Sequence, residues 1–132
     1  MKIVVTADGN DLDAQVSPFF GRCPTYVLVD TDTLEFEAIA NPAAAARGGA
    51  GVRAAQFVVE QGAGAVLTGN VGPNAYYVLR SANVPIYRTG EGTVRQAVEA
   101  YKSGALQAAQ QANVQPHAGM GGFGRRSMSG GA

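Results

Sequence analysis

Several kinds of residue are scarce in this chain, and each shortage narrows what the protein can be. The 132 residues include one cysteine, Cys23, one histidine, His117, and no tryptophan. A single cysteine excludes an internal disulfide and a zinc site built from several cysteines of one chain. A Ser–His–Asp triad is disfavoured as well, because His117 lies at the edge of a glycine-rich tail.

An excess of charge is also missing, since ten Lys and Arg balance ten Asp and Glu. Contacts to many phosphates need a basic surface, so we expect neither nucleic acid nor an anionic membrane among the partners. No apolar run approaches the roughly 20 residues that a bilayer span needs. The first strand reaches the carboxylate of Asp8 too soon for a signal peptide, and we therefore expect a cytoplasmic protein.

What the chain does have is enough apolar residues, 46%, for a body of roughly 105 residues to bury a core. Its regular periodicity stops near Leu106. Residues 107–115 are polar and rich in Ala and Gln, and residues 119–132 contain six glycines. Because such segments cannot offset their ordering entropy by burial, the sequence predicts one domain over residues 1–106 and a disordered tail over 107–132.

The first half of the domain predicts three strands and little helix. The expected strands are residues 2–8, 25–30 and 34–40, and the last two form an antiparallel hairpin. Between the first two strands, proline and glycine in residues 16–24 forbid a long helix. We expect one helical turn there, with Ser17 as its N-cap and Pro18 at its first position.

The second half alternates helices with short strands. Helices are predicted at residues 52–61, at 74–82 and from Gly92 to Gly104, and strands at residues 65–68 and 84–88. A hairpin followed by such units predicts an α/β fold. Its sheet is mixed, its later strands are parallel, and the helices pack against it.

Turns rich in glycine and asparagine follow several strands, and parallel strands bring such turns to one edge of a sheet. Free N–H groups and helix N-termini at that edge suit an anion. The alternative is that these residues only make tight turns and helix caps. The candidate anion-binding residues are Gly69, Asn70, Gly72 and Asn74 in one turn, and Gly90, Gly92 and Thr93 in another.

The sequence lacks the motifs of several common classes of enzyme. No Gly-x-x-x-x-Gly-Lys-Ser/Thr loop exists, so a nucleoside triphosphatase is disfavoured. Residues 49–54 fit a dinucleotide fingerprint only formally, because no strand precedes them and no acid follows about 20 positions later. The acids are too scattered for a two-metal nuclease, and we expect no enzyme.

Cys23 is the one soft ligand, and it lies between Arg22 and Pro24 in a turn that we expect to be exposed. A neighbouring guanidinium favours the thiolate, which is the form that binds metals. The alternative is a small apolar residue packed beneath the turn. Phe19 and Phe20 are expected to fill the core, although one of them can line the loop edge.

Four ordered stretches resemble the dinitrogenase iron-molybdenum cofactor biosynthesis family, which includes NifX/NafY-type proteins and the C-terminal domain of the NifB type. They are residues 1–10, 16–24, 68–75 and 90–94, so the resemblance spans about residues 1–106. It implies a ribonuclease-H-like α/β fold with a mixed five-stranded sheet. It also implies binding or carrying of an iron–sulfur or iron–molybdenum cluster precursor without catalysis, with cluster donor and acceptor proteins as partners.

The chain departs from the family pattern at one position of interest. Cluster-carrying members often have His-Phe-Gly where this chain has Phe19, Phe20 and Gly21, and the resemblance makes Cys23 the candidate substitute ligand. The alternative function is a metal-independent module that binds a small anion or a protein. One thiolate cannot hold a conventional four-cysteine cluster, so any cluster must arrive preassembled, be shared between chains or use other ligands.

Overall fold

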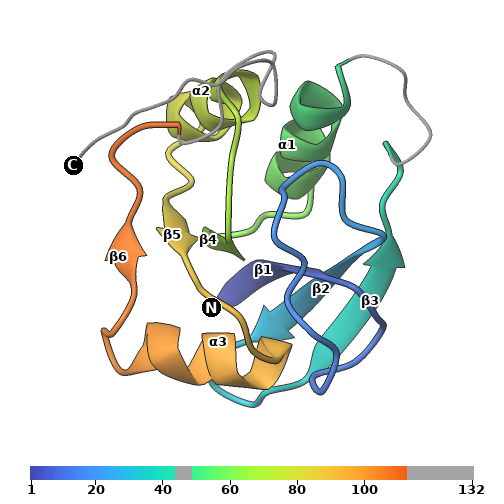
Figure 1. Ribbon diagram of the computed structural model, residues 1–132, viewed down its shortest axis with the longest axis vertical. Helices are drawn as coiled ribbons and strands as arrows, with labels where there is room; N and C mark the ends of the chain where they lie inside the picture. The colour runs from blue at the N-terminus through green and yellow to red at the C-terminus, as the bar shows by residue number, and fades with distance from the viewer. Residues whose placement is uncertain (44–48, 113–132) are drawn as a thin grey trace.

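A computed structural model describes residues 1–43 and 49–112 (Figure 1). Its centre is a six-stranded mixed sheet in the order β3-β2-β1-β4-β5-β6. In chain order the strands are β1 (Lys2–Ala7), β2 (Thr25–Asp30), β3 (Phe36–Ala40), β4 (Ala65–Thr68), β5 (Ile86–Arg88) and β6 (Gln107–Ala108). β3 and β6 are therefore the two edges of the sheet.

Strand direction divides the sheet into two parts. β1, β4 and β5 run parallel, whereas β2 and β3 form an antiparallel hairpin beside β1. Val27 of β2 lies opposite Val5 of β1 on one side and opposite Ala38 of β3 on the other. The predicted hairpin, the parallel strands and the mixed α/β architecture are confirmed.

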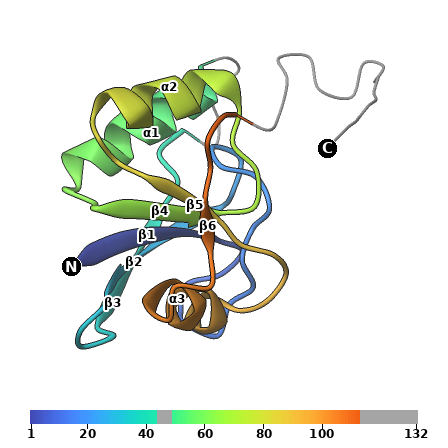
Figure 2. The same ribbon diagram turned by 90° about the vertical axis from the view of Figure 1, so that its left-hand side faces the viewer.

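Three helices cover the sheet in two layers (Figure 2). α1 (Ala50–Glu60) and α2 (Pro73–Ser81) lie on one face, and α3 (Val94–Lys102) lies on the other. α1 precedes β4 and α2 precedes β5. Both helices therefore run antiparallel to β1, β4 and β5, and both begin at the carboxyl ends of these strands. In the described part of the chain, no helix is long and apolar enough to cross a membrane.

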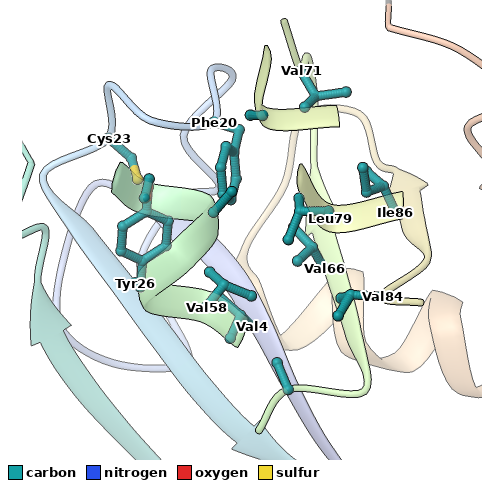
Figure 3. Packing of buried hydrophobic residues seen from close by; sticks show 14 of the residues in the cluster. Val4, Phe20, Cys23, Tyr26, Val58, Val66, Val71, Leu79, Val84 and Ile86 are labelled. Carbon is teal, nitrogen blue, oxygen red and sulfur yellow. The ribbon is translucent and has the colours of Figure 1, made fainter. Parts of the chain in front are cut away.

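The sheet separates two hydrophobic cores. Val4, Tyr26 and Leu79 are fully buried in the core beneath α1 and α2, where they pack with Phe20 (Figure 3). On the α3 face, the core is built from alternate residues of the same strands, among them Val5. Since each fully buried aliphatic side chain contributes about 1.5–3 kcal/mol, the two cores supply most of the driving force for folding.

The sixth strand corrects the prediction of a five-stranded sheet. Arg88 lies opposite Gln107, Tyr87 lies opposite Ala108, and the N–H of Ala109 donates to Ile86 O at 2.7 Å. Both residues of β6 are exposed, so backbone hydrogen bonds hold this strand in place, and no apolar sequence pattern predicts it. The predicted boundary after residue 106 thus falls just before a strand. The predicted disorder of residues 113–132 lies outside the described residues.

The predicted helical turn at Ser17 is wrong, because Gln15, Val16 and Phe19 form isolated β-bridges and no residue from 15 to 20 is helical. This stretch, here called the crossing segment, runs over the ends of β1 and β4. The N–H of Ser17 donates to Thr6 O at 2.9 Å, and the N–H of Phe20 donates to Asn70 O at 2.9 Å. The backbone groups that a helical turn would pair internally are instead paired with two other parts of the chain.

Candidate functional site

The carboxyl ends of β1, β4 and β5 lie together at one end of the sheet (Figure 1). This surface is called the carboxyl edge, and it is distinct from the edge strands β3 and β6. α1 and α2 also begin there, side by side. A Cβ placed on Gly51, in the first turn of α1, would lie 3.4 Å from the Cβ of Ala75 in the first turn of α2. Two adjacent helix N-termini add their positive ends, so this edge attracts negative charge.

In the first turn of α2, two backbone N–H groups have no acceptor among the residues that the structure describes. Gly72 is the N-cap and makes no side-chain cap, and Pro73 has no N–H. Among residues 1–43 and 49–112, nothing accepts a hydrogen bond from the N–H of Asn74 or of Ala75. Asn74 is exposed. Of the candidate anion-binding residues, Gly72 and Asn74 are the two that lie at the start of α2 beside these N–H groups.

Gly69 and Asn70 hold the crossing segment. A Cβ on Gly69 would lie 2.8 Å from Pro18 O, so a side chain at residue 69 would collide with the backbone. Asn70 donates from Nδ2 to Pro18 O at 2.9 Å and accepts from the N–H of Phe20. Two backbone segments approach closely here, which explains why residue 69 is a glycine and why residue 70 is an asparagine.

Gly90, Gly92 and Thr93 lie at the start of α3, on the other side of the sheet. Thr93 Oγ1 accepts from Gln96 N at 3.1 Å and Gln96 Oε1 accepts from Thr93 N at 2.9 Å, which is a capping box. The next two N–H groups donate to carbonyl oxygens of Ala14 and Leu12. The predicted role of Thr93 as an anion donor is therefore corrected, since its N–H is already bonded.

Two buried hydroxyl groups fix the floor of the carboxyl edge. Thr6 and Thr68 are fully buried at the ends of β1 and β4. Thr6 Oγ1 lies 2.7 Å from Ser17 O and 2.9 Å from Thr68 Oγ1. Since Thr6 has a single O–H, it donates to Ser17 O, and the hydroxyl of Thr68 donates to Thr6. The crossing segment is thus bonded to the sheet by side chains as well as by its backbone.

Cys23 is fully buried, which corrects the expectation of an exposed turn (Figure 3). Burial raises the pKa of its thiol, and a hydrogen bond with the Tyr26 hydroxyl opposes this shift only in part. Arg22 is exposed and is not among the causes of that pKa shift. The expected activation of a thiolate by Arg22 is therefore absent, and the structure agrees with Cys23 as a packed residue.

Comparison with known proteins identifies the group to which this fold and edge belong. The sequence pattern of the family described as dinitrogenase iron-molybdenum cofactor matches residues 1–104. The chain belongs to this family. All the candidate site residues lie within the match, and β6 lies outside it.

Two solved structures and one further sequence are similar to this chain. The apo form of the orange protein from Desulfovibrio gigas is 40% identical, with a TM-score of 0.82 over 85% of this chain and 95% of that one. A Thermotoga protein named for NifB is 33% identical, with a TM-score of 0.71 over 81% of this chain and 91% of that one. Protein MJ0580 of Methanocaldococcus jannaschii is 29% identical over 110 residues, covering 81% of this chain and 90% of that protein.

Phe19 and Phe20 have different surroundings. Phe20 is 6% exposed and packs against Tyr26, with ring centroids 5.7 Å apart, which confirms a core role. Phe19 is 47% exposed, so it lines the edge and does not fill the core. At the position where the resemblance implies a histidine ligand, this family member presents a phenyl ring to solvent.

Asn41 is a structural residue of the edge that sequence reasoning missed. It is 7% exposed, and its Nδ2 donates to Gly21 O at 3.1 Å and to Cys23 O at 2.8 Å. Its Oδ1 accepts from Ala43 N at 2.8 Å. One amide thereby joins the end of β3 to the turn that holds Cys23. An asparagine followed by proline directly after a strand was the available signal for such a turn.

Metal-ligating side chains are dispersed. Within residues 1–43 and 49–112, no three His, Cys, Asp or Glu side chains are grouped so that they could hold a metal ion. Asp8, which follows β1, is exposed at the edge.

Proposed function

We propose that this protein binds and carries a preassembled anionic iron–sulfur or iron–molybdenum cluster precursor, without catalysing a reaction. The observation that carries the proposal is membership of the dinitrogenase iron-molybdenum cofactor family over residues 1–104. The neighbour named for NifB and the orange protein, which was solved in an apo form, support the same role. Cluster donor and acceptor proteins are the expected partners.

The binding surface that we propose is the start of α2. The N–H groups of Asn74 and Ala75 have no acceptor within the described chain, and the first turn of α1 adds a second positive helix end beside them. A cluster with net negative charge accepts hydrogen bonds from such groups through its sulfur atoms. Arg22 is exposed in a turn that lies against α1, since a Cβ on Gly21 would lie 3.2 Å from Gly51 Cα. Its guanidinium adds positive charge near the start of α1.

Cys23 cannot ligate a cluster at the surface without a change in the turn around it. Its thiol is buried beneath residues that Asn41 and Tyr26 hold in place. Ligation therefore requires the turn to open and a buried thiol to ionise, and both steps are unfavourable. We propose that the cargo is held mainly by N–H groups and charge, which makes its binding weak and transferable.

Anaerobic titration with a preformed iron–sulfur cluster tests this function. Visible absorbance of the protein fraction after gel filtration measures the bound cluster. We expect Gly72→Val to reduce occupancy at least fivefold, because a branched side chain covers the N–H groups at the start of α2. Gly90→Val is the matched control, since a side chain at Gly90 meets nothing within 4 Å.

Two results would contradict the proposal. Equal occupancy in wild type and Gly72→Val would remove the start of α2 as the site. No coloured protein in any sample would favour the metal-independent alternative, which a parallel titration with inorganic phosphate then examines at the same edge. Arg22→Gln removes a positive charge but no backbone N–H donor. It should therefore weaken the binding of the cluster and of phosphate, each in proportion to the charge of the ligand.

A further inference from the structure

β3 is an edge strand, and no strand of the described chain pairs with its outer side. It lies at one end of the sheet order, next to β2 alone (Figure 1). The other edge, β6, contains two residues, whereas β3 contains five. A strand of five residues offers a row of backbone groups long enough to pair with another strand.

The hydrogen-bond pattern identifies which residues of β3 face outward. Asp30 N donates to Glu35 O at 2.9 Å, and Asn41 N donates to Pro24 O at 3.0 Å. Both pairs follow the β2–β3 register, so the odd-numbered residues of β3 bond to β2. The N–H and C=O groups of Phe36, Ala38 and Ala40 therefore point away from the sheet. Nothing in the described chain bonds to them.

This edge lacks three of the features that usually prevent strand addition: proline, lysine and a bulge. Residues Phe36–Ala40 contain no proline and no lysine, and they follow a regular register without a bulge. Phe36 is 44% exposed. Its side chain lies on the α3 face, opposite Val29, so an added strand could pack an apolar residue against it.

The charged side chains of the segment that contains β3 are all acidic. The sequence from Cys23 to Ala46 contains no Lys or Arg, and it contains four acids. Asp30 and Asp32 are compensated by the N-terminal amine, at 3.9 and 3.5 Å. Glu35 and Glu37 form no ion pair within the described residues. Glu35 directly precedes β3 and Glu37 lies within it, and residues two apart in an extended chain lie on the same face.

We propose that β3 is a docking edge for an extended strand of a partner protein in which lysine or arginine alternates with apolar residues. Backbone hydrogen bonds to Phe36, Ala38 and Ala40 would hold that strand. Its basic side chains would lie beside Glu35 and Glu37 on one face. Its apolar side chains would cover Phe36 on the other. This surface is separate from the start of α2, so the inference does not depend on the proposed cargo.

A second copy of the chain is a poorer occupant of this edge. Pairing of two β3 strands would bring two acidic hairpins together, with Glu35 and Glu37 of both copies beside one face of the joined sheet. Like charges at that spacing oppose association. A basic strand gains from the same charges, and charge complementarity therefore selects the partner.

Amide hydrogen exchange with a synthetic probe tests the proposal. The probe is a capped seven-residue peptide of alternating lysine and valine, and the control replaces every lysine with glutamate. In the full chain we expect the lysine peptide to slow exchange of the Phe36, Ala38 and Ala40 amides at least tenfold. The amides of Glu37 and Ile39 already bond to β2 and should change little.

Two variants separate strand addition from simple charge attraction. Ala38→Pro removes an outward N–H and no bond to β2, so it should weaken peptide binding about tenfold while the fold persists. Reversal of both charges in Glu35→Lys/Glu37→Lys should invert the preference toward the glutamate peptide. Glu99→Lys on α3 is the control for one charge reversal elsewhere.

The proposal fails if the lysine peptide binds without slowing the three outward amides, because binding would then be electrostatic only. It also fails if the peptide does not bind wild type at millimolar concentration in low salt. Protection of those amides that rises with protein concentration, without peptide, would show that a second copy occupies the edge and would overturn the proposed partner.

Discussion

Buried polar side chains fix the backbone around the carboxyl edge. Thr6, Asn41 and Tyr26 each bond to backbone or hydroxyl groups that would otherwise be buried without a partner. A satisfied hydrogen bond contributes about 0.5–1.5 kcal/mol, but an unsatisfied buried group costs about 1–3 kcal/mol. The role of such residues is therefore tested best by removing them.

Asn41→Ala should destabilise the protein by about 3 kcal/mol. The change leaves Gly21 O, Cys23 O and Ala43 N without their partner, and water reaches this site poorly because Asn41 is buried. Urea unfolding measures the loss. Asn10→Ala removes a single 3.2 Å hydrogen bond to Thr25 and should cost less than about 1 kcal/mol. Equal losses in the two variants would contradict a special role for Asn41.

Cys23 should make stability depend on alkaline pH. Its thiol pKa is raised by burial, so the folded protein retains a proton that the unfolded chain releases near pH 8.5. Stability is therefore complete below that pH and falls as the pH rises above it. Between pH 7.5 and 9.5, we expect wild type to lose on the order of 1 kcal/mol more than Cys23→Ala in urea unfolding. Parallel pH profiles would mean that the thiol is not buried in solution.

Cys23→Ser addresses the same residue as a ligand. Serine keeps the shape, and its hydroxyl can bond to Tyr26, so we expect a loss of about 1 kcal/mol in stability. Cluster occupancy should stay within twofold of wild type, because the thiol lies beneath the surface. A sharp fall in occupancy with stability preserved would instead establish that the turn opens and that Cys23 ligates the cargo.

At the scale of elements, the crossing segment depends on glycine in β4's following turn. Gly69→Ala should cost about 1–3 kcal/mol, since the added Cβ would lie 2.8 Å from Pro18 O and the backbone must shift. Gly90→Ala is the matched control, because it has open space and should change stability by less than about 0.5 kcal/mol. Thermal unfolding compares them. A neutral Gly69→Ala would show that the crossing segment moves easily.

Elements with their own periodicity could be predicted from the sequence, and elements held by distant partners could not. The helices α2 and α3 bury residues three and four apart, so local spacing located them. The crossing segment and β6 are held by backbone bonds to β1, β5 and the turn after β4. Ser17 followed by Pro18 fits a helix start equally well, and only tertiary pairing decides against it.

The candidate site was predicted in the same uneven way. The carboxyl edge could be predicted from the strand order, and Gly72 and Asn74 lie at that edge, at the start of α2. Thr93 carries a cap, as the simpler alternative stated, because its signal is the same for a cap and for an anion site. The exposure of Cys23 could not be predicted, since it depends on how Asn41 and Tyr26 enclose the turn.

At the scale of the whole molecule, the two proposed surfaces are joined by one short stretch of chain. β3 ends at Ala40, and Asn41 directly after it organises the turn that holds Arg22 and Cys23. A partner strand added along β3 would therefore lie close to the carboxyl edge. A carrier that docks its partners beside its cargo shortens the path of transfer, and this arrangement is consistent with both proposals.

The extent of the folded unit can be measured by two truncations of the chain. Removal of residues after Pro116 retains β6 and should change stability by less than about 0.5 kcal/mol, because the glycine-rich composition offers little to bury. Removal after Leu106 deletes β6 and the bond from Ala109 N to Ile86 O. It also removes Ala109, which packs against the hydrophobic core that contains Ile86.

We expect the shorter chain to lose about 1–3 kcal/mol, since backbone groups of β5 lose partners and part of the core becomes exposed. For a domain of this size, such a loss lowers the midpoint of thermal unfolding by roughly 4–8 °C per kcal/mol, against a shift of a few degrees at most for truncation after Pro116. Equal midpoints for the two truncated chains would place the boundary of the domain before β6. A large loss on truncation after Pro116 would place it beyond residue 116.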